Sequence, residues 1–215
     1  WHNISFGKLT GIDDNSLQAN ITTFFDGINR DQLKKLGEEP FNVRITHEEY
    51  IFAVHFERIH EDSDTVSDID IYTVMLFDET QIAKLEDKLD EDKLVVANVF
   101  IDNYDDTLAE ENDVKNSLLA AVIERKIRKY FGEADAIIRK LEKDKYFLIF
   151  PKKYLNKLID DKFSLLEEIK NTKVGNDTQV TLSIGLGLNG GTYARDAEFA
   201  KTATNLALGR GGAIA

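Results

Sequence analysis

The stretch Leu94-Val-Val-Ala-Asn-Val-Phe-Ile-Asp-Asn-Tyr-Asp-Asp106 decides the fold of this chain, because an unbroken apolar run changes abruptly into carboxylates. An apolar run of this length, bounded by polar residues, is typical of a strand buried in a sheet. Acidic side chains that follow such a strand lie at the edge of the sheet, where phosphate-handling enzymes hold their metal ions. The stretch therefore predicts a buried strand over residues 94–101 that delivers carboxylates to such an edge.

Strand and helix patterns alternate after this stretch. Residues 136–141 and 146–150 predict the two strands of a hairpin, joined by Glu142-Lys143-Asp144-Lys145 and closed by Pro151. The other predicted elements are a helix around 113–131, a helix around 152–171, a strand over 180–188 and a helix over 193–208. This βαββαβα order predicts one α/β domain over residues 94–215, with a sheet flanked by helices.

The N-terminal part of the chain predicts a different sheet. Helix and loop signals extend to about residue 40, and period-two alternation then predicts strands over 41–46 and 50–59 around a His47-Glu48-Glu49 turn. A third strand is expected over 69–77, because this segment is rich in β-branched and aromatic residues. Residues 1–80 therefore predict an antiparallel sheet with helices, and the fold class of the whole chain is α+β.

An acidic segment over residues 81–93 connects the two parts and predicts a helix. Ile82, Leu85 and Leu89 recur at three- and four-residue spacing, which gives one narrow apolar seam among charged residues. Such a seam can pair with its copy in a homodimer, although two turns are too short for a self-sufficient coiled coil. The alternative is a helix that lies on its own domain.

Composition excludes several classes of protein. The chain has 215 residues, a formal net charge of -12 and no cysteine. The negative charge argues against nucleic acid as a partner, because such binding needs clustered Lys and Arg. The absence of cysteine excludes disulfides and thiolate metal sites. No stretch reaches the roughly 18 apolar residues that span a bilayer, so the chain itself is expected to be soluble and cytoplasmic.

Three segments together resemble a known family. Residues 94–106, the stretch Val180-Thr-Leu-Ser-Ile-Gly-Leu-Gly187 and the stretch Leu206-Ala-Leu-Gly-Arg-Gly-Gly212 are similar, in order and spacing, to the degenerate GGDEF domain of the GdpP/YybT family of membrane-bound cyclic-di-AMP phosphodiesterases. The resemblance implies a nucleotidyl-cyclase-like fold for residues 94–215. It also implies a PAS-like sensory domain over residues 1–80, whose N-terminal strands are expected to be missing.

The resemblance further implies that cyclase chemistry is lost. Active diguanylate cyclases carry glycines in the hairpin turn, which let the backbone approach the nucleotide phosphates, whereas residues 142–146 contain none. Phe100 stands where those cyclases place a metal-binding Asp, so Asp102 and Asp144 are the carboxylates that remain. A two-metal site needs more carboxylates than these. We therefore predict no catalytic residues and assign Asp102 and Asp144 to nucleotide binding, with Mg²⁺ or Mn²⁺ accompanying ATP.

Two interpretations of the carboxylates stay open. Asp102, Asp105 and Asp106 follow a strand, where acidic residues are commonly solvated loop and helix-cap residues. Strand ends are also where ligands bind in open α/β sheets, and members of the family are associated with weak ATP hydrolysis at the degenerate domain. The domain is therefore expected to be at most a weak ATPase, or a module without chemistry.

The glycine-rich segments are interpreted as structural. Gly209-Arg-Gly-Gly212 follows a predicted helix, whereas a phosphate loop precedes one, so we expect a helix C-cap there. Ser183-Ile-Gly-Leu-Gly187 lacks the spacing of a dinucleotide-binding motif, and its glycines are interpreted as close-packing positions in a central strand.

All four histidines, at positions 2, 47, 55 and 60, lie in the PAS-like part. Members of the family include haem-binding proteins, so haem is a candidate cofactor with a histidine as its axial ligand. No spacing singles out a ligand. His55 alternates with Val54 and Phe56, and we interpret it as an ordinary strand residue.

The resemblance also implies a function. The phosphodiesterase chemistry of the family lies in a downstream DHH/DHHA1 module that uses Mn²⁺ and hydrolyses cyclic-di-AMP to pApA, and no Asp-His-His occurs in this chain. We therefore expect a regulatory region, at the cytoplasmic face of the plasma membrane in the parent protein. It is expected to bind a small nucleotide or haem and to control the downstream module as a homodimer. The alternatives are a weak ATPase and a purely structural dimerisation module.

Overall fold

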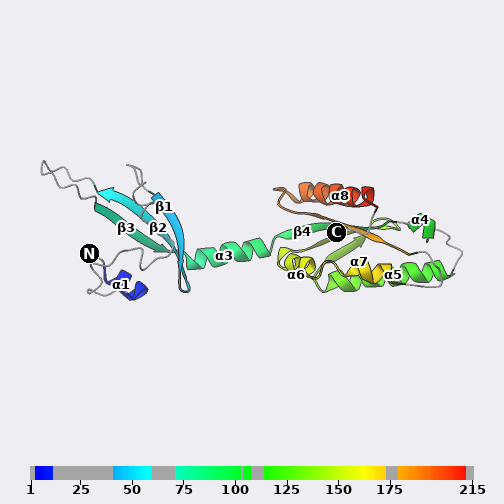
Figure 1. Cartoon of the computed structure of the whole chain (residues 1–215), viewed down its shortest axis with the longest axis horizontal. Helices are drawn as coiled ribbons and strands as arrows, with labels where there is room; N and C mark the ends of the chain where they lie inside the picture. Colours follow the sequence, from blue (N-terminus) through cyan, green and yellow to red (C-terminus); the bar gives the residue numbers. More distant parts are fainter. Residues whose placement is uncertain are drawn as a thin grey trace. The chain divides into compact units, whose positions relative to one another are not determined.

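A computed structural model describes residues 3–11, 41–59, 71–102, 104–107, 114–172 and 179–211. The chain divides into two compact units, Trp1–Asp87 and Lys88–Ala215 (Figure 1). The division falls inside one helix, α3 (Thr80–Glu91). Among the described residues, no helix is long and apolar enough to cross a bilayer.

The first unit contains a helix and an antiparallel sheet with the strand order β1-β2-β3. Its elements are α1 (Ile4–Thr10), β1 (Phe41–His47), β2 (Tyr50–Ile59) and β3 (Ile71–Asp78). The predicted hairpin is confirmed, because His47 pairs with Tyr50 across a two-residue turn. Alternation along β2 buries Phe52, Val54 and Phe56, which form the centre of the core of this unit. The three predicted strands are present, and the PAS-like identity of the unit stays a prediction.

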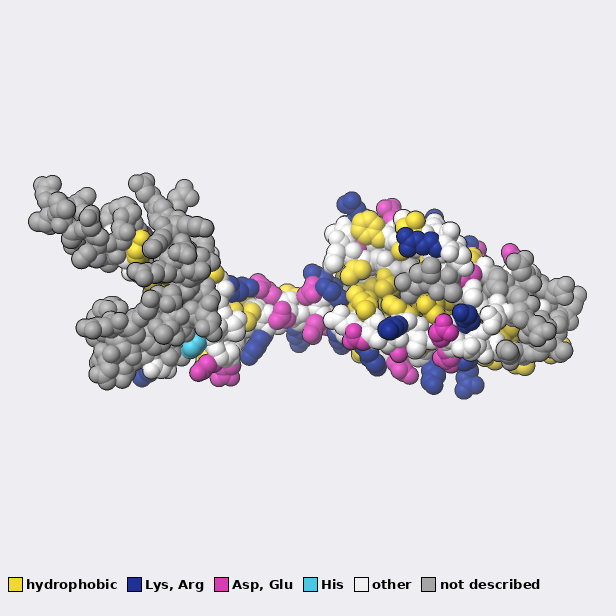
Figure 2. Space-filling view, in the orientation of Figure 1, with side chains coloured by type: hydrophobic (Ala, Val, Ile, Leu, Met, Phe, Trp, Pro, Cys, Tyr) yellow, Lys and Arg dark blue, Asp and Glu magenta, His cyan; other side chains and the backbone are white. Residues whose placement is uncertain are grey.

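Helix α3 is fixed at its first turn. The side chain of Asp78 accepts a hydrogen bond from the main-chain nitrogen of Thr80 (2.9 Å), which caps the helix. The guanidinium of Arg44 on β1 binds Glu79 at 2.7 Å and Glu86 at 2.9 Å. Beyond this attachment, Lys, Arg, Asp and Glu side chains are mixed along α3 (Figure 2).

The apolar seam of α3 is exposed. Ile82, Leu85 and Leu89 are exposed by 51%, 59% and 69%, whereas Ala83 on the same helix is buried. The pairing of this seam with its copy in a homodimer stays a prediction.

The second unit is a four-stranded antiparallel sheet with the order β5-β6-β4-β7. Helix α8 covers one face, and α5, α6 and α7 cover the other (Figure 1). The elements in chain order are β4 (Leu94–Ile101), α4 (Tyr104–Thr107), α5 (Val114–Gly132), β5 (Ile137–Lys140), β6 (Lys145–Pro151), the 3₁₀ turn η3 (Lys152–Tyr154), α6 (Leu155–Asp160), α7 (Leu165–Lys170), β7 (Leu182–Gly187) and α8 (Tyr193–Gly209). The predicted βαββαβα order is confirmed, except that the helix predicted around residues 152–171 is divided. The short helix α4 is additional.

Strand β4 is the central strand that the apolar run predicts. It lies between β6 and β7, and Val95, Ala97 and Val99 are almost completely buried on the face that α5, α6 and α7 cover. Ile123 and Ile127 of α5 belong to the same core cluster and have no exposed surface. The core of this unit therefore lies between the sheet and the α5–α7 layer.

The single helix predicted around residues 152–171 is wrong. The structure breaks it at Asp161–Ser164, where Lys162 and Phe163 have φ angles of 53° and 50°. Phe163 is buried in the core, and the carboxylate of Asp161 accepts hydrogen bonds from the main-chain nitrogen and the hydroxyl of Ser164. The turn interrupts the helix, and in return Phe163 packs in the core and Asp161 caps the start of α7 through Ser164.

Candidate functional site

Asp102 stands at the end of β4 and is tied to the beginning of the neighbouring strand. Its main-chain nitrogen donates to the oxygen of Thr181 (3.0 Å), and the hydroxyl of Thr181 donates to Oδ2 of Asp102 (2.8 Å). The side chain is half-buried. One oxygen of the Asp102 carboxylate is therefore oriented by a residue that is distant in the sequence.

Asp144 lies in the hairpin turn at the same end of the sheet. Its main-chain oxygen accepts a hydrogen bond from the nitrogen of Ile101 (2.9 Å), so the turn continues the pairing of β6 with β4. The structure thus brings Asp102 and Asp144 to the ends of adjacent strands. Their role in nucleotide binding stays a prediction.

The turn itself is closed by the main chain. The nitrogens of Leu141 and Glu142 both donate to the oxygen of Lys145, at 2.9 and 3.3 Å. Residues 142–144 are described and none of them has a positive φ. Ordinary side chains therefore fit this turn without backbone strain.

A cation and an aromatic ring stand next to these carboxylates. Phe100 pairs with Lys145 across β4 and β6, and the Lys145 ammonium lies 5.6 Å from the centre of the Phe100 ring. The same ammonium donates to Glu142 at 2.7 Å. This hydrogen bond raises the pKa of Lys145, and the negative charges of Glu142 and Asp144 act in the same direction. The group therefore stays positively charged at neutral pH.

This arrangement does not fit a two-metal centre. Divalent cations need several oxygen ligands, and they are repelled by an ammonium group. Within the described ranges, no group of three or more His, Asp or Glu side chains could hold a metal ion. The binding of Mg²⁺ or Mn²⁺ with ATP at Asp102 and Asp144 stays a prediction, and the positive charge of Lys145 already interacts with Asp144.

The glycines of β7 are packing positions, as predicted. A Cβ at Gly185 would lie 2.2 Å from the hydroxyl of Thr204, and one at Gly187 would lie 1.8 Å from the main-chain oxygen of Asp196. Helix α8 can therefore approach the sheet only because these side chains are absent. At the other end of α8, Arg210 is the C-cap and Gly211 has a φ of 102°, which confirms the predicted cap. Gly212 lies outside the described residues.

His47 and His55 are the histidines of the first unit that the structure describes. The Nδ1 atom of His55 is 2.6 Å from Oδ1 of Asn42, and its strand neighbours Val54 and Phe56 are the residues that enter the core. His55 therefore does not fit as an axial ligand facing that core. His47 lies at the end of β1, whereas His2 and His60 lie outside the described residues.

Sequence reasoning missed Thr181 and the pairing of Lys145 with Phe100. Thr181 carries no motif, and its hydrogen bond spans 79 residues. The Lys145–Phe100 contact depends on the register of β4 and β6, which no local pattern specifies.

Comparison with known proteins places the second unit in a family. The family described as "Cyclic-di-AMP phosphodiesterase GdpP-like, GGDEF domain" matches residues 99–213. The cyclic-di-AMP phosphodiesterase GdpP of Geobacillus thermodenitrificans is 27% identical over 136 residues, which are 63% of this chain and 21% of the relative. The cyclic-di-AMP phosphodiesterase PdeA of Listeria monocytogenes is 28% identical over 137 residues, which are 64% and 21%. The chain thus spans about a fifth of the length of the curated relatives it matches.

A solved structure shows the same fold. The active GGEEF domain of a diguanylate cyclase from Vibrio cholerae superposes with a TM-score of 0.51 at 11% identity, covering 62% of this chain and 87% of that domain. The likeness supports the cyclase-like architecture of the second unit and says nothing about its chemistry.

Proposed function

The chain belongs to the family of cyclic-di-AMP phosphodiesterase GdpP-like GGDEF domains, and we propose that it is a regulatory region of a longer cyclic-di-AMP phosphodiesterase. The observation that carries the proposal is the contact between Phe100 and Lys145 inside a GGDEF fold. The strand ends that a cyclase uses for metal-dependent phosphoryl transfer hold an aromatic ring and a fixed ammonium here. A domain that keeps the fold without the metal chemistry is suited to binding and control.

The proposed ligand of the second unit is a nucleotide at the Asp102 end of the sheet. The ammonium of Lys145 supplies a positive charge for a phosphate, while Asp102 and Asp144 offer acceptors for ribose or base groups. In the parent protein, occupancy of this place would be transmitted to a downstream DHH/DHHA1 module that carries Mn²⁺ and cleaves cyclic-di-AMP. The parent is proposed to act at the cytoplasmic face of the plasma membrane.

The proposed assembly is a homodimer through α3. Its exposed seam of Ile82, Leu85 and Leu89 is what such a contact would bury, and the charged residues around it would remain in water. The helix is short, so other surfaces of the two units must add to the contact.

A PAS-like role for the first unit remains part of the proposal. The buried aromatic face of its sheet, with Phe52 and Phe56, supports a sensory domain with an apolar interior. Haem stays a candidate ligand only with an axial ligand other than His55, because that ring is bound to Asn42.

A titration tests the proposed function. The purified chain is titrated with ATP, GTP, cyclic-di-AMP and haem, and binding is followed by calorimetry and by amide chemical shifts. Saturable binding of a nucleotide, with shifts at residues 100–102 and 142–146, supports the proposal. Absence of binding of all four compounds at millimolar concentration leaves the structural dimerisation module as the function.

A further inference from the structure

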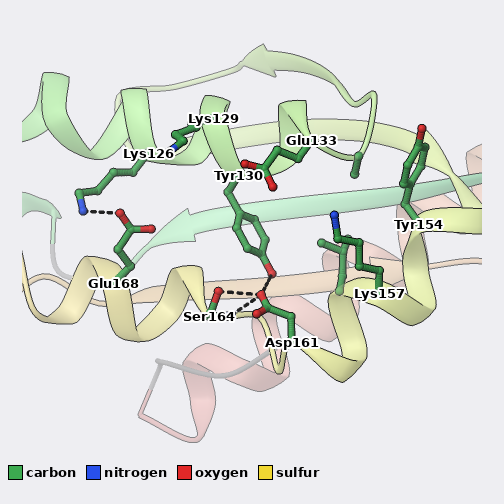
Figure 3. Close-up of a pocket in the computed structure, with 11 residues that line it drawn as sticks. Lys126, Lys129, Tyr130, Glu133, Tyr154, Lys157, Asp161, Ser164 and Glu168 are labelled. Carbon is green, nitrogen blue, oxygen red and sulfur yellow. Dashed lines mark hydrogen bonds and ion pairs between the residues drawn. The ribbon is translucent and has the colours of Figure 1, made fainter.

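A cavity of about 280 Å³ lies on the helical face of the second unit, between α5 and the α6–α7 turn (Figure 3). It is lined by three lysines and three carboxylates, namely Lys126, Lys129, Lys157, Glu133, Asp161 and Glu168. The charges of these groups balance, and Tyr130 and Ser164 already donate to Asp161 (Figure 3). The cavity therefore selects no charged ligand, and the surface that singles out a ligand is on the other face of the sheet.

That other face is covered only in part. Helix α8 packs on β7 and β4, and the half of the face formed by β6 and β5 is more exposed. Phe147 of β6 and Ile137 of β5 belong to this half, because their strand neighbours Leu148 and Ile138 contribute to the core on the α5 side. Ile137 is exposed by 68%, and Phe147 is half-buried. An aromatic ring is therefore presented on an open sheet surface.

A side-chain amide stands directly opposite this ring. Asn98 of β4 pairs with Phe147, and it lies on the same face because Ala97 and Val99 contribute to the core on the α5 side. Asn98 is half-buried, and within the described part of the chain its amide makes no hydrogen bond. An amide offers a donor and an acceptor side by side. Asn98 therefore has unused hydrogen-bonding capacity beside an aromatic ring.

A hydroxyl on the same face also lacks a partner. Ser183 of β7 pairs with Phe100, is completely buried, and has no hydrogen bond to its Oγ atom among the described residues. Buried polar side chains are in the large majority hydrogen-bonded. The polar groups of this face are thus not all satisfied by the protein itself.

We propose that Asn98 and Phe147 form a platform that binds the adenine-type base of a nucleoside or small nucleotide. Bases stack on aromatic side chains of open sheets, and β4 and β6 are the two central strands of this sheet. An asparagine amide pairs with the N6 and N7 atoms of adenine, which guanine does not match. The net charge of -12 argues against a polynucleotide on the same surface.

This inference rests on the proposed nucleotide-binding function and names its base subsite. Phe100 and Lys145 pair two positions along the strands from Asn98 and Phe147, which is about 7 Å away. A nucleotide therefore spans both pairs, with its phosphate near Lys145 and its base over Phe147.

The test uses adenosine, which carries no phosphate, and the whole chain. Binding is measured by amide chemical shifts and calorimetry, and purine riboside, which lacks the 6-amino group, is the comparison ligand. We expect adenosine to bind about fivefold more tightly than purine riboside, with shifts at residues 98–100 and 147. This comparison uses the unaltered chain, so it does not depend on the folding of any variant.

Two variants separate stacking from hydrogen bonding. Phe147→Leu should weaken the binding of both compounds by about tenfold, because it removes the ring on which the base stacks. Asn98→Leu should remove the difference between the two compounds. The matched control is Phe199→Leu, which removes a partly exposed aromatic ring from α8, and its affinity should stay within about twofold of the parent.

The platform is overturned if adenosine causes no shifts at Asn98 and Phe147 at about 10 mM, or if Phe147→Leu binds adenosine as tightly as the parent. ATP binding with shifts confined to residues 100–102 and 142–146 would also overturn it, while the proposed function would stand. Adenosine binding at the platform, with no further shift at residues 142–146 when ATP is added, supports the platform and contradicts the proposed phosphate position at Lys145.

Discussion

The ammonium of Lys145 lies 5.6 Å from the centre of the Phe100 ring, at paired positions of β6 and β4. A divalent cation at these strand ends would find an aromatic ring where it needs an oxygen ligand. The positive charge of the lysine would also repel it. The contact therefore explains, with one pair of residues, why this GGDEF-like unit is proposed to control chemistry instead of performing it.

Replacing this pair should create metal affinity. In Phe100→Asp/Lys145→Ala, a carboxylate joins Asp102 and Asp144 and the ammonium is gone. Mn²⁺ at about ten times its Kd should then raise the melting temperature by about 5 °C, because a ligand that binds only the folded state stabilises it. The control Phe100→Leu/Lys145→Ala removes the ammonium without adding a carboxylate and should not respond. A similar Mn²⁺ response in the parent chain would contradict the explanation.

If the chain hydrolyses ATP slowly, the reaction should depend on the remaining carboxylates. Asp102→Asn and Asp144→Asn should each lower the rate by about tenfold while the fold persists. Thr181→Val, which removes the hydroxyl bound to Asp102, should have a smaller effect on the same rate. Unchanged rates in both Asn variants would place the activity elsewhere.

Association should depend on the exposed seam of α3. Burying a leucine contributes about 1.5 to 3 kcal/mol, so Leu85→Asp/Leu89→Asp should weaken dimerisation by several kcal/mol in sedimentation velocity. Gln81→Asp adds a negative charge to the same helix without removing an apolar side chain, and should leave association nearly unchanged. A parent chain that is monomeric at high micromolar concentration would contradict the proposed dimer.

Close packing of α8 should make Gly187 intolerant of a side chain. Gly187→Ala places a Cβ 1.8 Å from the main-chain oxygen of Asp196, so we expect the free energy of unfolding to fall by about 3 kcal/mol or more. Gly132 at the end of α5 has no atom within 4 Å of such a Cβ, and Gly132→Ala should be neutral or slightly stabilising. Denaturant unfolding of both variants provides the comparison, and equal stabilities would show that α8 can move away from the sheet.

The Asp161 turn should make stability depend on pH. Hydrogen bonds from Ser164, and then from Tyr130, hold the pKa of Asp161 below its ordinary value. A carboxyl whose pKa is lower in the folded state contributes stability above its unfolded pKa of about 3.9, and this contribution is lost as the pH falls through the folded pKa. Asp161→Asn should therefore melt below the parent at pH 7, and the difference should shrink below about pH 4. A difference that is independent of pH would indicate a purely steric effect.

The strands could be predicted because period-two alternation and the apolar run of β4 are local signals. The break between α6 and α7 could not, because Leu155, Leu158, Leu165 and Ile169 keep a spacing that a continuous helix also satisfies. What decides the break is the burial of Phe163, a tertiary contact that overrides local preference.

The site could be predicted only in part. Asp102 and Asp144 are visible in the sequence, because a strand end and a hairpin turn place them. Their neighbours follow from strand register and from a hydrogen bond to Thr181, and both are properties of the assembled sheet. The cavity beside Tyr130 depends on the same break that the helical pattern conceals.

We propose that this chain binds a ligand and controls a downstream module, and that it neither cleaves cyclic-di-AMP nor makes cyclic-di-GMP. The most direct measurement incubates the purified chain with cyclic-di-AMP, and separately with GTP, in the presence of Mn²⁺, and follows the products by chromatography. We predict no pApA and no cyclic-di-GMP above the buffer control. Turnover of either substrate that persists through repeated purification, and that is lost in Asp102→Asn, would contradict the account.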